Sequence, residues 1–376
     1  MISLCKNIFK AIIGLSLAFH LTGCSLSSPV REEAPSKVSL NPISAFKSEW
    51  EISDLKYIDV LGQVLAVADD GGIFLDIKSG KPAAQISAGD KIDKVALDSS
   101  GRLVMLSSRD RVRIIDVTNK NILWEKMDER NSGDQVSAFA PDGQSLYAFS
   151  KIWTLNNPQP IKDVYYPAAP MSSEISRDNR FLLNTGLYGA IDLADMKTGK
   201  YLHEWDTDNF IAGGIFSLDS KSAYIVNGAK GIITFSRKTN RIAVYDLTTY
   251  ERKEQLTHDG NITTLVISPT TGDIFTGTDT GEIYQWSANT FENTARWKGN
   301  GRVQASTTDE SGRVWFGYDN GEIKLYDPKQ KALSTVTKLQ ASTTKIAVSK
   351  NSDVLTVVEA SGQKREVLIF QVMGLQ

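Results

Sequence analysis

Hydrophobic and polar positions alternate in short runs through most of the chain from residue 46 onward, and small polar turns separate the runs. A period of two predicts β-strands that bury one face. The clearest copies are residues 95–108, 136–150, 265–278 and 346–359, each of which reads as two strands around one turn. No convincing amphipathic helix lies between the strands, which argues against a parallel α/β fold. The pattern therefore predicts an all-β protein.

The first turn of this pattern recurs at regular intervals. Its copies are Leu61-Gly62, Ser100-Gly101, Asp142-Gly143, Asp178-Asn179, Asp219-Ser220, Thr271-Gly272, Ser311-Gly312 and Asn351-Ser352. Their second residues are 39, 42, 36, 41, 52, 40 and 40 positions apart. A second turn and two more strands follow in most copies, and four short strands in about forty residues are typical of a β-propeller blade. Eight copies favour eight blades. The first copy is the weakest, so seven blades is the alternative.

The two ends of the repeat region predict how the ring closes. Trp occurs in several fourth strands, at residues 122–127, 202–206 and 294–298, and residues 46–52 (FKSEWEI) resemble these strands. The last repeat ends at residues 370–372 without a fourth strand of its own. We therefore expect residues 46–52 to complete the last blade, which leaves no long free edge in the ring.

The first residues of the chain have the pattern of an export signal. Lys6 and Lys10 precede an apolar stretch at residues 11–19, which is too short to span a bilayer. The following Leu21-Thr22-Gly23-Cys24 resembles a lipobox, the cleavage site that ends in a lipid-accepting cysteine. The alternatives are an ordinary secretory signal with an incidental cysteine and an uncleaved anchor.

The lipobox sets the expected domain boundaries. We expect a signal peptide at residues 1–23, an acylated Cys24, a flexible Ser- and Pro-rich tether at 24–45 and the propeller at 46–376. Ser25 is not the Asp that usually retains bacterial lipoproteins in the inner membrane, so we expect the outer membrane, with the protein facing the periplasm. The inner membrane and the other leaflet stay open as alternatives.

Charge and cysteine content narrow the classes of function. The chain has 42 Lys and Arg against 44 Asp and Glu and no long basic run, which argues against a nucleic-acid partner. Its two cysteines, Cys5 and Cys24, both precede the propeller, so the folded body has no disulfide, thiolate metal site or cysteine nucleophile. A body without thiols suits an oxidising compartment.

Enzymatic chemistry has little support in the sequence. After Cys24 the chain has two histidines, His203 in an expected outer strand and His258, and neither GxSxG nor a phosphate loop occurs. The acidic pairs at residues 69–70 and 206–208 lack the full ligand spacing of a calcium loop. We therefore expect no catalytic residues, no metal site and no cofactor.

Residues 46–376 resemble the WD40/YVTN/PQQ-like propeller superfamily. The best copy of a WD repeat runs from His258 through Ile267-Ser268-Pro269 and Asp279 to Trp286. The resemblance implies a structural hydrogen-bond network of His258, a Ser or Thr, Asp279 and Trp286, although Asp279 sits one position off the usual register. A lipidated propeller is also similar in architecture to the propeller lipoprotein of the outer-membrane β-barrel assembly machinery, which implies a partner in an envelope protein or complex.

Two segments depart from the repeat, and both are expected on the face that carries the loops between blades. The first is residues 156–171, which are Pro-rich, with Trp153 just before them and Tyr165 and Tyr166 within them. The second is the insertion at 227–240. It contains Lys230, Phe235, Arg237 and Lys238. Aromatic and Arg side chains commonly anchor interfaces, so these seven residues are the candidate partner-binding residues. The alternative is ordinary loop variation.

Two hypotheses about function follow. The first is a non-enzymatic envelope scaffold, held at the membrane by its lipid anchor, that docks a partner through one propeller face. The second is a periplasmic propeller that acts on or binds a small molecule or glycan. Convergent carboxylates in a central funnel would favour the second hypothesis.

Overall fold

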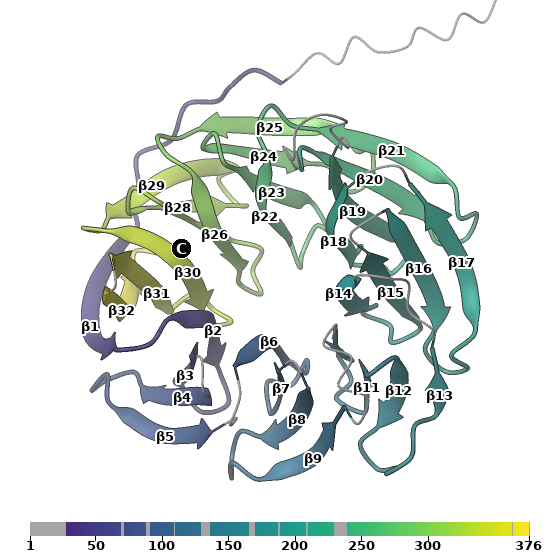
Figure 1. Ribbon diagram of the computed structural model, residues 1–376. Coiled ribbons are helices and arrows are strands. Elements are labelled where there is room, and N and C mark those ends of the chain that lie inside the picture. The colour runs from purple at the N-terminus through teal and green to yellow at the C-terminus, as the bar shows by residue number, and fades with distance from the viewer. Residues whose placement is uncertain are drawn as a thin grey trace, which may run out of the picture.

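The computed structural model describes residues 28–375 except 69–70, 88–90, 109, 129–135, 165–169, 187–188, 208–209, 229–238 and 363. All regular secondary structure in these residues is β-strand, and none of it is a helix that could cross a membrane. The strands form eight four-stranded antiparallel sheets around a central axis, as Figure 1 shows. The chain is therefore an eight-bladed β-propeller, and the alternative of seven blades is wrong.

Blades 1 to 7 are each continuous in sequence, and the first strand of each lies nearest the axis (Figure 1). Blade 1 contains β2 (Ile52–Ile58), β3 (Gln63–Ala68), β4 (Gly71–Asp76) and β5 (Pro82–Ser87). Blade 2 contains β6 (Ile92–Leu97), β7 (Leu103–Ser108), β8 (Arg111–Asp116) and β9 (Ile122–Met127). Blade 3 contains β10 (Ala138–Phe139), β11 (Ser145–Ala148), β12 (Lys151–Thr154) and β13 (Lys162–Asp163). Blade 4 contains β14 (Pro170–Ile175), β15 (Phe181–Gly186), β16 (Ala190–Asp195) and β17 (Tyr201–Asp206).

The second half of the ring follows the same plan. Blade 5 contains β18 (Phe210–Phe216), β19 (Ser222–Gly228), β20 (Arg241–Asp246) and β21 (Arg252–Thr257). Blade 6 contains β22 (Ile262–Ile267), β23 (Ile274–Thr278), β24 (Glu282–Trp286) and β25 (Asn293–Lys298). Blade 7 contains β26 (Val303–Thr308), β27 (Val314–Tyr318), β28 (Glu322–Asp327) and β29 (Ala332–Lys338). Blade 8 contains β30 (Ser342–Val348), β31 (Val354–Ser361), β32 (Lys364–Met373) and, as its outer strand, β1 (Ser39–Ser48).

The antiparallel order divides the turns between two faces. Turns from first to second strand and from third to fourth strand lie on the first face, whereas turns from second to third strand and the connections between blades lie on the second face. In all eight first-to-second turns the second residue has a positive φ, from 57° at Ser220 to 83° at Gly312. Five of these residues are Gly, which adopts this conformation without steric cost. The recurring turn dipeptide in the sequence therefore has a conformational cause.

Apolar side chains packed between neighbouring blades form the core. Second and third strands are buried on both sides because each lies between two blades; Phe74 of blade 1, for example, packs with Val104 and Ile115 of blade 2. Fourth strands turn one side to solvent, yet Trp124 and Trp297 in them are 6% and 1% exposed. The Trp residues of these outer strands therefore seal the junctions between blades.

Ring closure by an N-terminal strand is confirmed, because β1 pairs antiparallel with β32 from Ser39↔Met373 to Ser48↔Arg365. The extent of the strand differs from the prediction. It begins at Ser39 rather than at residue 46, since Leu40, Ile43 and Phe46 pack against the cores around blade 8. Residues 39–45 thus belong to a blade and not to a tether. Trp50 follows the strand and is 40% exposed, so it does not pack like the other outer-strand Trp residues.

Third strands end in a capped turn that recurs in six blades. Its first residues are Asp76, Asp116, Asp195, Asp246, Ser287 and Asp327, and each side chain accepts a hydrogen bond from a backbone N–H two or three residues later. The residue four positions after each has a positive φ. Blade 3 lacks this turn, and its outer strand has only two residues.

Candidate functional site

The second face is irregular on one half of the ring. The connection between blades 2 and 3 spans residues 128–137, and the turn between β19 and β20 of blade 5 spans 229–240. Blades 6, 7 and 8, by contrast, are joined by residues 299–302 and 339–341 alone. The strands that flank both segments end or begin at the second face of blades 2–5, and the middle parts of the segments lie outside the described residues. The sequence repeat predicts the departure at blade 5 and does not predict the one at 128–137.

Most of the candidate partner-binding residues lie outside the described part of the chain. These are Tyr165, Tyr166, Lys230, Phe235, Arg237 and Lys238. Trp153 is described, and it is buried in β12, where its indole Nε1–H donates to the backbone carbonyl of Ala148 at 3.0 Å. Its ring packs edge-on against Trp124 of blade 2 at 5.5 Å. The prediction that Trp153 contacts a partner is wrong, because the side chain is part of the core.

The predicted departure at residues 156–171 is not one connection. Residues 155–161 form the turn from third to fourth strand on the first face, and β13 follows them. Only residues 164–169 connect blade 3 to blade 4 on the second face, beginning at the buried Val164. Tyr165 and Tyr166 lie outside the described residues, whereas the Pro-rich part before them lies on the first face.

The hydrogen-bond network around His258 forms as the resemblance implies, except for Asp279. His258 is 2% exposed, its Nε2 lies 2.8 Å from the Thr276 hydroxyl, and the Trp286 indole N–H donates to the same nitrogen at 3.2 Å. The Nδ1 atom of His258 has no hydrogen-bond partner among the described residues. Burial lowers the pKa of His258 to about 4, so the ring is neutral at physiological pH. The role is structural: it joins the end of blade 5 to blade 6.

Asp279 supports the base of the blade 5 insertion instead of joining the histidine network. Its carboxylate accepts the backbone N–H and the side-chain amide of Asn261, both at 2.7 Å. The Asn261 side-chain oxygen in turn accepts the N–H of Thr239 at 3.0 Å, where the insertion returns to the described chain. The neighbouring Asn240 carbonyl accepts the His258 N–H at 2.9 Å. One end of the insertion is therefore fixed to the blade 5–6 connection.

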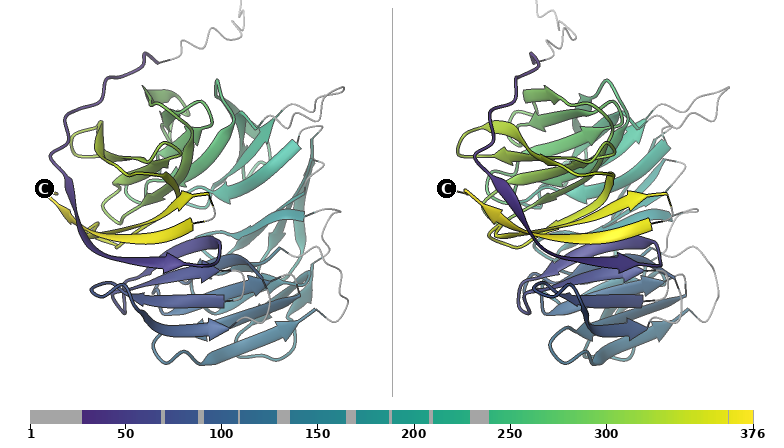
Figure 2. Two further views of the ribbon diagram at one scale, coloured as in Figure 1. Left: turned by 60° about the vertical axis from the view of Figure 1, so that its left-hand side comes forward. Right: turned by 90° about the vertical axis from the view of Figure 1, so that its left-hand side faces the viewer.

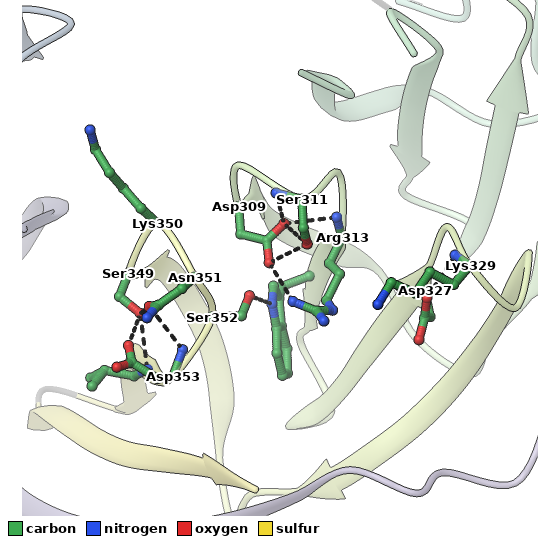
Figure 3. Close-up of polar contacts among 12 residues, drawn as sticks. Asp309, Ser311, Arg313, Asp327, Lys329, Ser349, Lys350, Asn351, Ser352 and Asp353 are labelled. Atoms are coloured by element: carbon green, nitrogen blue, oxygen red, sulfur yellow. Dashed lines mark hydrogen bonds and ion pairs between the residues drawn. The ribbon is translucent and has the colours of Figure 1, made fainter. Parts of the chain in front are cut away.

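On the first face, polar groups of the turns form hydrogen bonds to other residues of the ring. Figure 3 shows the turns of blades 7 and 8, where Asp309 accepts bonds from Ser311 and from both the backbone and guanidinium of Arg313. The Trp315 indole N–H donates to Ser352 of the next turn at 3.1 Å.

Hydrogen bonds from backbone N–H groups to backbone carbonyls or side-chain oxygens join turns of neighbouring blades on this face. Donor and acceptor pairs are Ser99 to Pro141, Asp142 to Asn179, Asp178 to Ser220, Glu310 to Lys350, and Lys350 to Asp59. Several hydrogen-bonding groups of this face therefore link neighbouring blades.

The central channel contains two cavities lined mainly by innermost strands, the first mostly polar and the second mostly apolar. One, of about 410 Å³, lies among blades 1, 6, 7 and 8 and is lined by Tyr57, Ser306, Thr344 and Lys345. The carboxylate of Asp54 in this cavity pairs with Lys56 at 3.1 Å. The other cavity, of about 350 Å³, lies among blades 2, 4, 5 and 6. The single carboxylate of its lining, Glu174, lies beside Lys94, so the described carboxylates of the channel do not converge.

A buried polar cluster joins blades 2, 3 and 4 next to the second cavity. The ammonium of Lys94 donates to the backbone carbonyls of Ser137 at 2.7 Å and Ser173 at 2.8 Å. Burial lowers the pKa of Lys94 and raises the pKa of Glu174. Burial, together with Glu204 across the strand pair, raises the pKa of Asp192 to about 7. The Oδ2 atom of Asp192 has no partner among the described residues, so this junction is imperfectly satisfied. Across the described residues, no group of three or more His, Cys, Asp or Glu side chains could hold a metal ion.

The outer strand of blade 2 exposes apolar side chains. In β9, Ile122, Leu123 and Met127 are 48%, 51% and 54% exposed. Edge strands are ordinarily protected by charged side chains, and an apolar edge marks a contact surface. This edge borders the half of the ring that carries the long second-face segments.

Residues 28–38, which we call the strap, lie along the outside of the ring. Figures 1 and 2 show the strap, in purple, beside blades 6 and 7 before it enters β1. Val30 forms a parallel bridge to Arg296 of β25, and the Arg31 N–H donates to the Arg296 carbonyl at 2.7 Å. Further along the strap, the Ala34 N–H donates to the carbonyl of Leu333 in β29 at 2.9 Å. The expected tether is thus packed from Ser28 onward. No periodic signal in this Ser- and Pro-rich stretch could have predicted the contact.

No model of a known protein family matches the sequence, and no curated protein matches it.

Proposed function

We propose that this protein is a non-enzymatic scaffold of the bacterial cell envelope, anchored by an acylated Cys24, that docks a partner protein through the second face of blades 2–5. The proposed location is the outer membrane, with the propeller in the periplasm. The observation that carries the proposal is the concentration of long second-face segments on blades 2–5, opposite the half with short connections.

The residue types in these segments suit a protein interface. Tyr165, Tyr166, Phe235 and Arg237 are among the side chains that most often contribute large shares of binding energy. The base of the blade 5 insertion is held by Asn261 and Asp279, which lowers the entropy lost when the segment binds. The apolar edge of β9 extends the available surface toward the rim.

The central channel gives less support to a glycan- or small-molecule-binding enzyme. Hydrolysis of a glycoside uses two carboxyl groups that face one bond. Asp54 and Glu174 line different cavities, and each lies near a lysine. The geometry of the described residues therefore favours docking.

Affinity purification of the acylated, full-length protein from solubilised envelopes tests the proposal. The test variant combines Arg237→Glu, Lys238→Glu and Tyr165→Ala. The matched control is Arg302→Glu, an exposed charge reversal in the short connection between blades 6 and 7 on the same face. We expect one stoichiometric partner to copurify with the wild type and the control and to be lost from the test variant.

Two outcomes would contradict the proposal. Recovery of no stoichiometric protein with the wild type would refute the scaffold function. Equal recovery with the test variant and the control would show that the partner binds elsewhere than on these segments.

A further inference from the structure

The strap is attached to the ring by a buried ion pair as well as by backbone bonds. The ammonium of Lys324 in β28 contacts the Glu33 carboxylate, and its side chain is 4% exposed. The second oxygen of Glu33 accepts the hydroxyl of Thr335 in β29 at 2.6 Å. A buried lysine needs a counter-charge, and Glu322 at 3.5 Å supplies only part of it. The strap is therefore an integral part of blade 7.

The strap ends on blade 6, close to the proposed lipid anchor in sequence. The Ser28 hydroxyl donates to the backbone carbonyl of Asn293, the first residue of β25 at its first-face end. Cys24 precedes Ser28 by four residues, and four fully extended residues span at most about 14 Å. That distance is about the width of one four-stranded blade, whose strands are about 4.8 Å apart.

We infer that acylated Cys24 holds the first-face rim of blades 6 and 7 against the lipid surface and so points the second face of blades 2–5 away from it. The inference rests on the proposed lipid anchor. A twenty-residue tether would let the ring rotate freely relative to the bilayer. The linker from Cys24 to Ser28, which we call the leash, is only four residues long and ends on a packed strap, so it fixes which edge of the ring faces the bilayer. Blades 2 and 3 lie opposite blades 6 and 7 in an eight-bladed ring, so the connection between blades 2 and 3 is far from the membrane-facing rim. Blade 5 neighbours blade 6, and its insertion is directed away from the lipid surface because it belongs to the second face.

Lipid-dependent quenching at two matched positions tests this orientation. Thr290 of blade 6 and Asn119 of blade 2 are exposed, and each side chain accepts a backbone N–H two residues later in the equivalent third-to-fourth turn. The chain after Cys24 has no cysteine, so Thr290→Cys and Asn119→Cys can each carry a single fluorophore on the acylated protein. The proteins are reconstituted into phosphatidylethanolamine–phosphatidylglycerol vesicles that contain a headgroup spin-labelled lipid.

We expect quenching at least about twofold stronger at Thr290→Cys than at Asn119→Cys, because the leash allows about 14 Å of separation at most. Insertion of about twenty Gly and Ser residues between Cys24 and Ser28 should abolish that difference, since such a linker spans about 25 Å on average and orients nothing. Vesicle flotation of this variant should equal that of the wild type.

Quenching and vesicle flotation together distinguish a wrong orientation of the ring from a missing lipid anchor. Equal quenching at the two positions in protein that floats with the vesicles would overturn the inference and leave the anchor intact. A wild type that floats no better than Cys24→Ser would refute the anchor and the inference with it.

Discussion

Buried polar side chains at two blade junctions make the stability of the ring depend on pH. His258 at the junction of blades 5 and 6 is neutral because burial lowers its pKa to about 4, against an ordinary value of 6.5. Asp192 at the junction of blades 3 and 4 has its pKa raised to about 7, against 3.8. The two shifts act in opposite directions as the pH changes, so single variants are needed to separate them.

For His258, the unfolded state takes up a proton between pH 6.5 and 4 and the native state does not. Stability is therefore lost as the pH falls through this window, by up to about 3 kcal/mol. We expect His258→Gln to flatten the slope of unfolding free energy against pH between 6.5 and 4 in urea titrations. An unchanged slope in the variant would contradict the assignment of a neutral, buried imidazole.

For Asp192, the native state holds a proton between pH 3.8 and 7 that the unfolded state has lost. Its contribution to stability is therefore greatest at low pH and is lost as the pH rises through 7. We expect Asp192→Asn to stabilise the protein by about 2–4 kcal/mol at pH 8 and to have little effect at pH 4. Glu204→Gln, which removes the cross-strand charge, should give a smaller change of the same sign in the same thermal or urea unfolding series. Destabilisation of Asp192→Asn at pH 8 would show that the carboxylate has a partner.

Sequence patterns identify residue types more reliably than side-chain directions. The WD-like copy correctly places His258 and Trp286 in one network, with Thr276 as the hydroxyl. Asp279 departs because its one-position offset brings its carboxylate to Asn261 instead. Trp153 lies next to a long segment in sequence, yet strand alternation turns it into the core. Direction depends on the register of the strand pair, which the spacing of turns does not determine.

Among the elements, the strap and the outer strands determine how well the rim is closed. Removing one member of a buried ion pair leaves an uncompensated charge, which costs more than the pair contributes. The contact between Glu33 and the buried Lys324 is therefore the most sensitive point of the strap.

We expect Glu33→Ala to lower the free energy of unfolding by about 2–4 kcal/mol, since Glu322 remains as a partial partner for Lys324. Combining it with Lys324→Met should recover most of the loss, because the buried charge is then absent. Glu32→Ala, at the exposed neighbouring position, should change stability by less than about 0.5 kcal/mol. If Glu33→Ala and Glu32→Ala unfold at the same urea concentration, the strap is not anchored by this pair.

Element boundaries at the N-terminus could be predicted only in part. The Trp-containing segment at 46–52 correctly indicates a closing strand, but the Ser and Pro residues before it read as linker. They form a strand from Ser39 because β32 offers a ten-residue edge that needs a partner. The Asp that ends most third strands is visible in the sequence and caps the turn that follows, whose left-handed fifth residue is variable in type.

At the scale of the whole molecule, the ring is closed by joining the two ends of the chain in blade 8. Without β1, the edge of β32 loses its partner, and the side chains of Ile43 and Phe46 no longer cover the neighbouring core. A ring opened at this point loses packing in blades 7, 8 and 1 together.

We expect a chain that begins at Ile52 to melt at least about 10 °C below the wild type, or to fail to fold, because the closing strand is missing. A chain that begins at Ser28 retains the strap and β1 and should melt at the wild-type temperature in the same calorimetric scan. Equal melting temperatures for both truncations would refute closure by β1.

The blade number and the overall ring could be predicted because the repeat is local: each turn and strand is encoded within about forty residues. The position of the candidate functional surface on the ring could not be predicted, because it depends on which blades are neighbours in space. The spacing of the turns does not reveal the long segment at 128–137. Blade 3 is itself short, so the distance between successive turns stays near forty residues despite the extra residues of the segment.

Site-specific photo-crosslinking in intact envelopes tests most directly whether the second face of blades 2–5 docks a partner. A photoreactive residue is placed at Phe235 in the blade 5 insertion, at Asn300 on the second face between blades 6 and 7, and at Asp142 on the first face of blade 3. We predict a single discrete adduct from position 235 and none from positions 300 and 142. No adduct at 235, or an equal adduct at 142, would contradict the account.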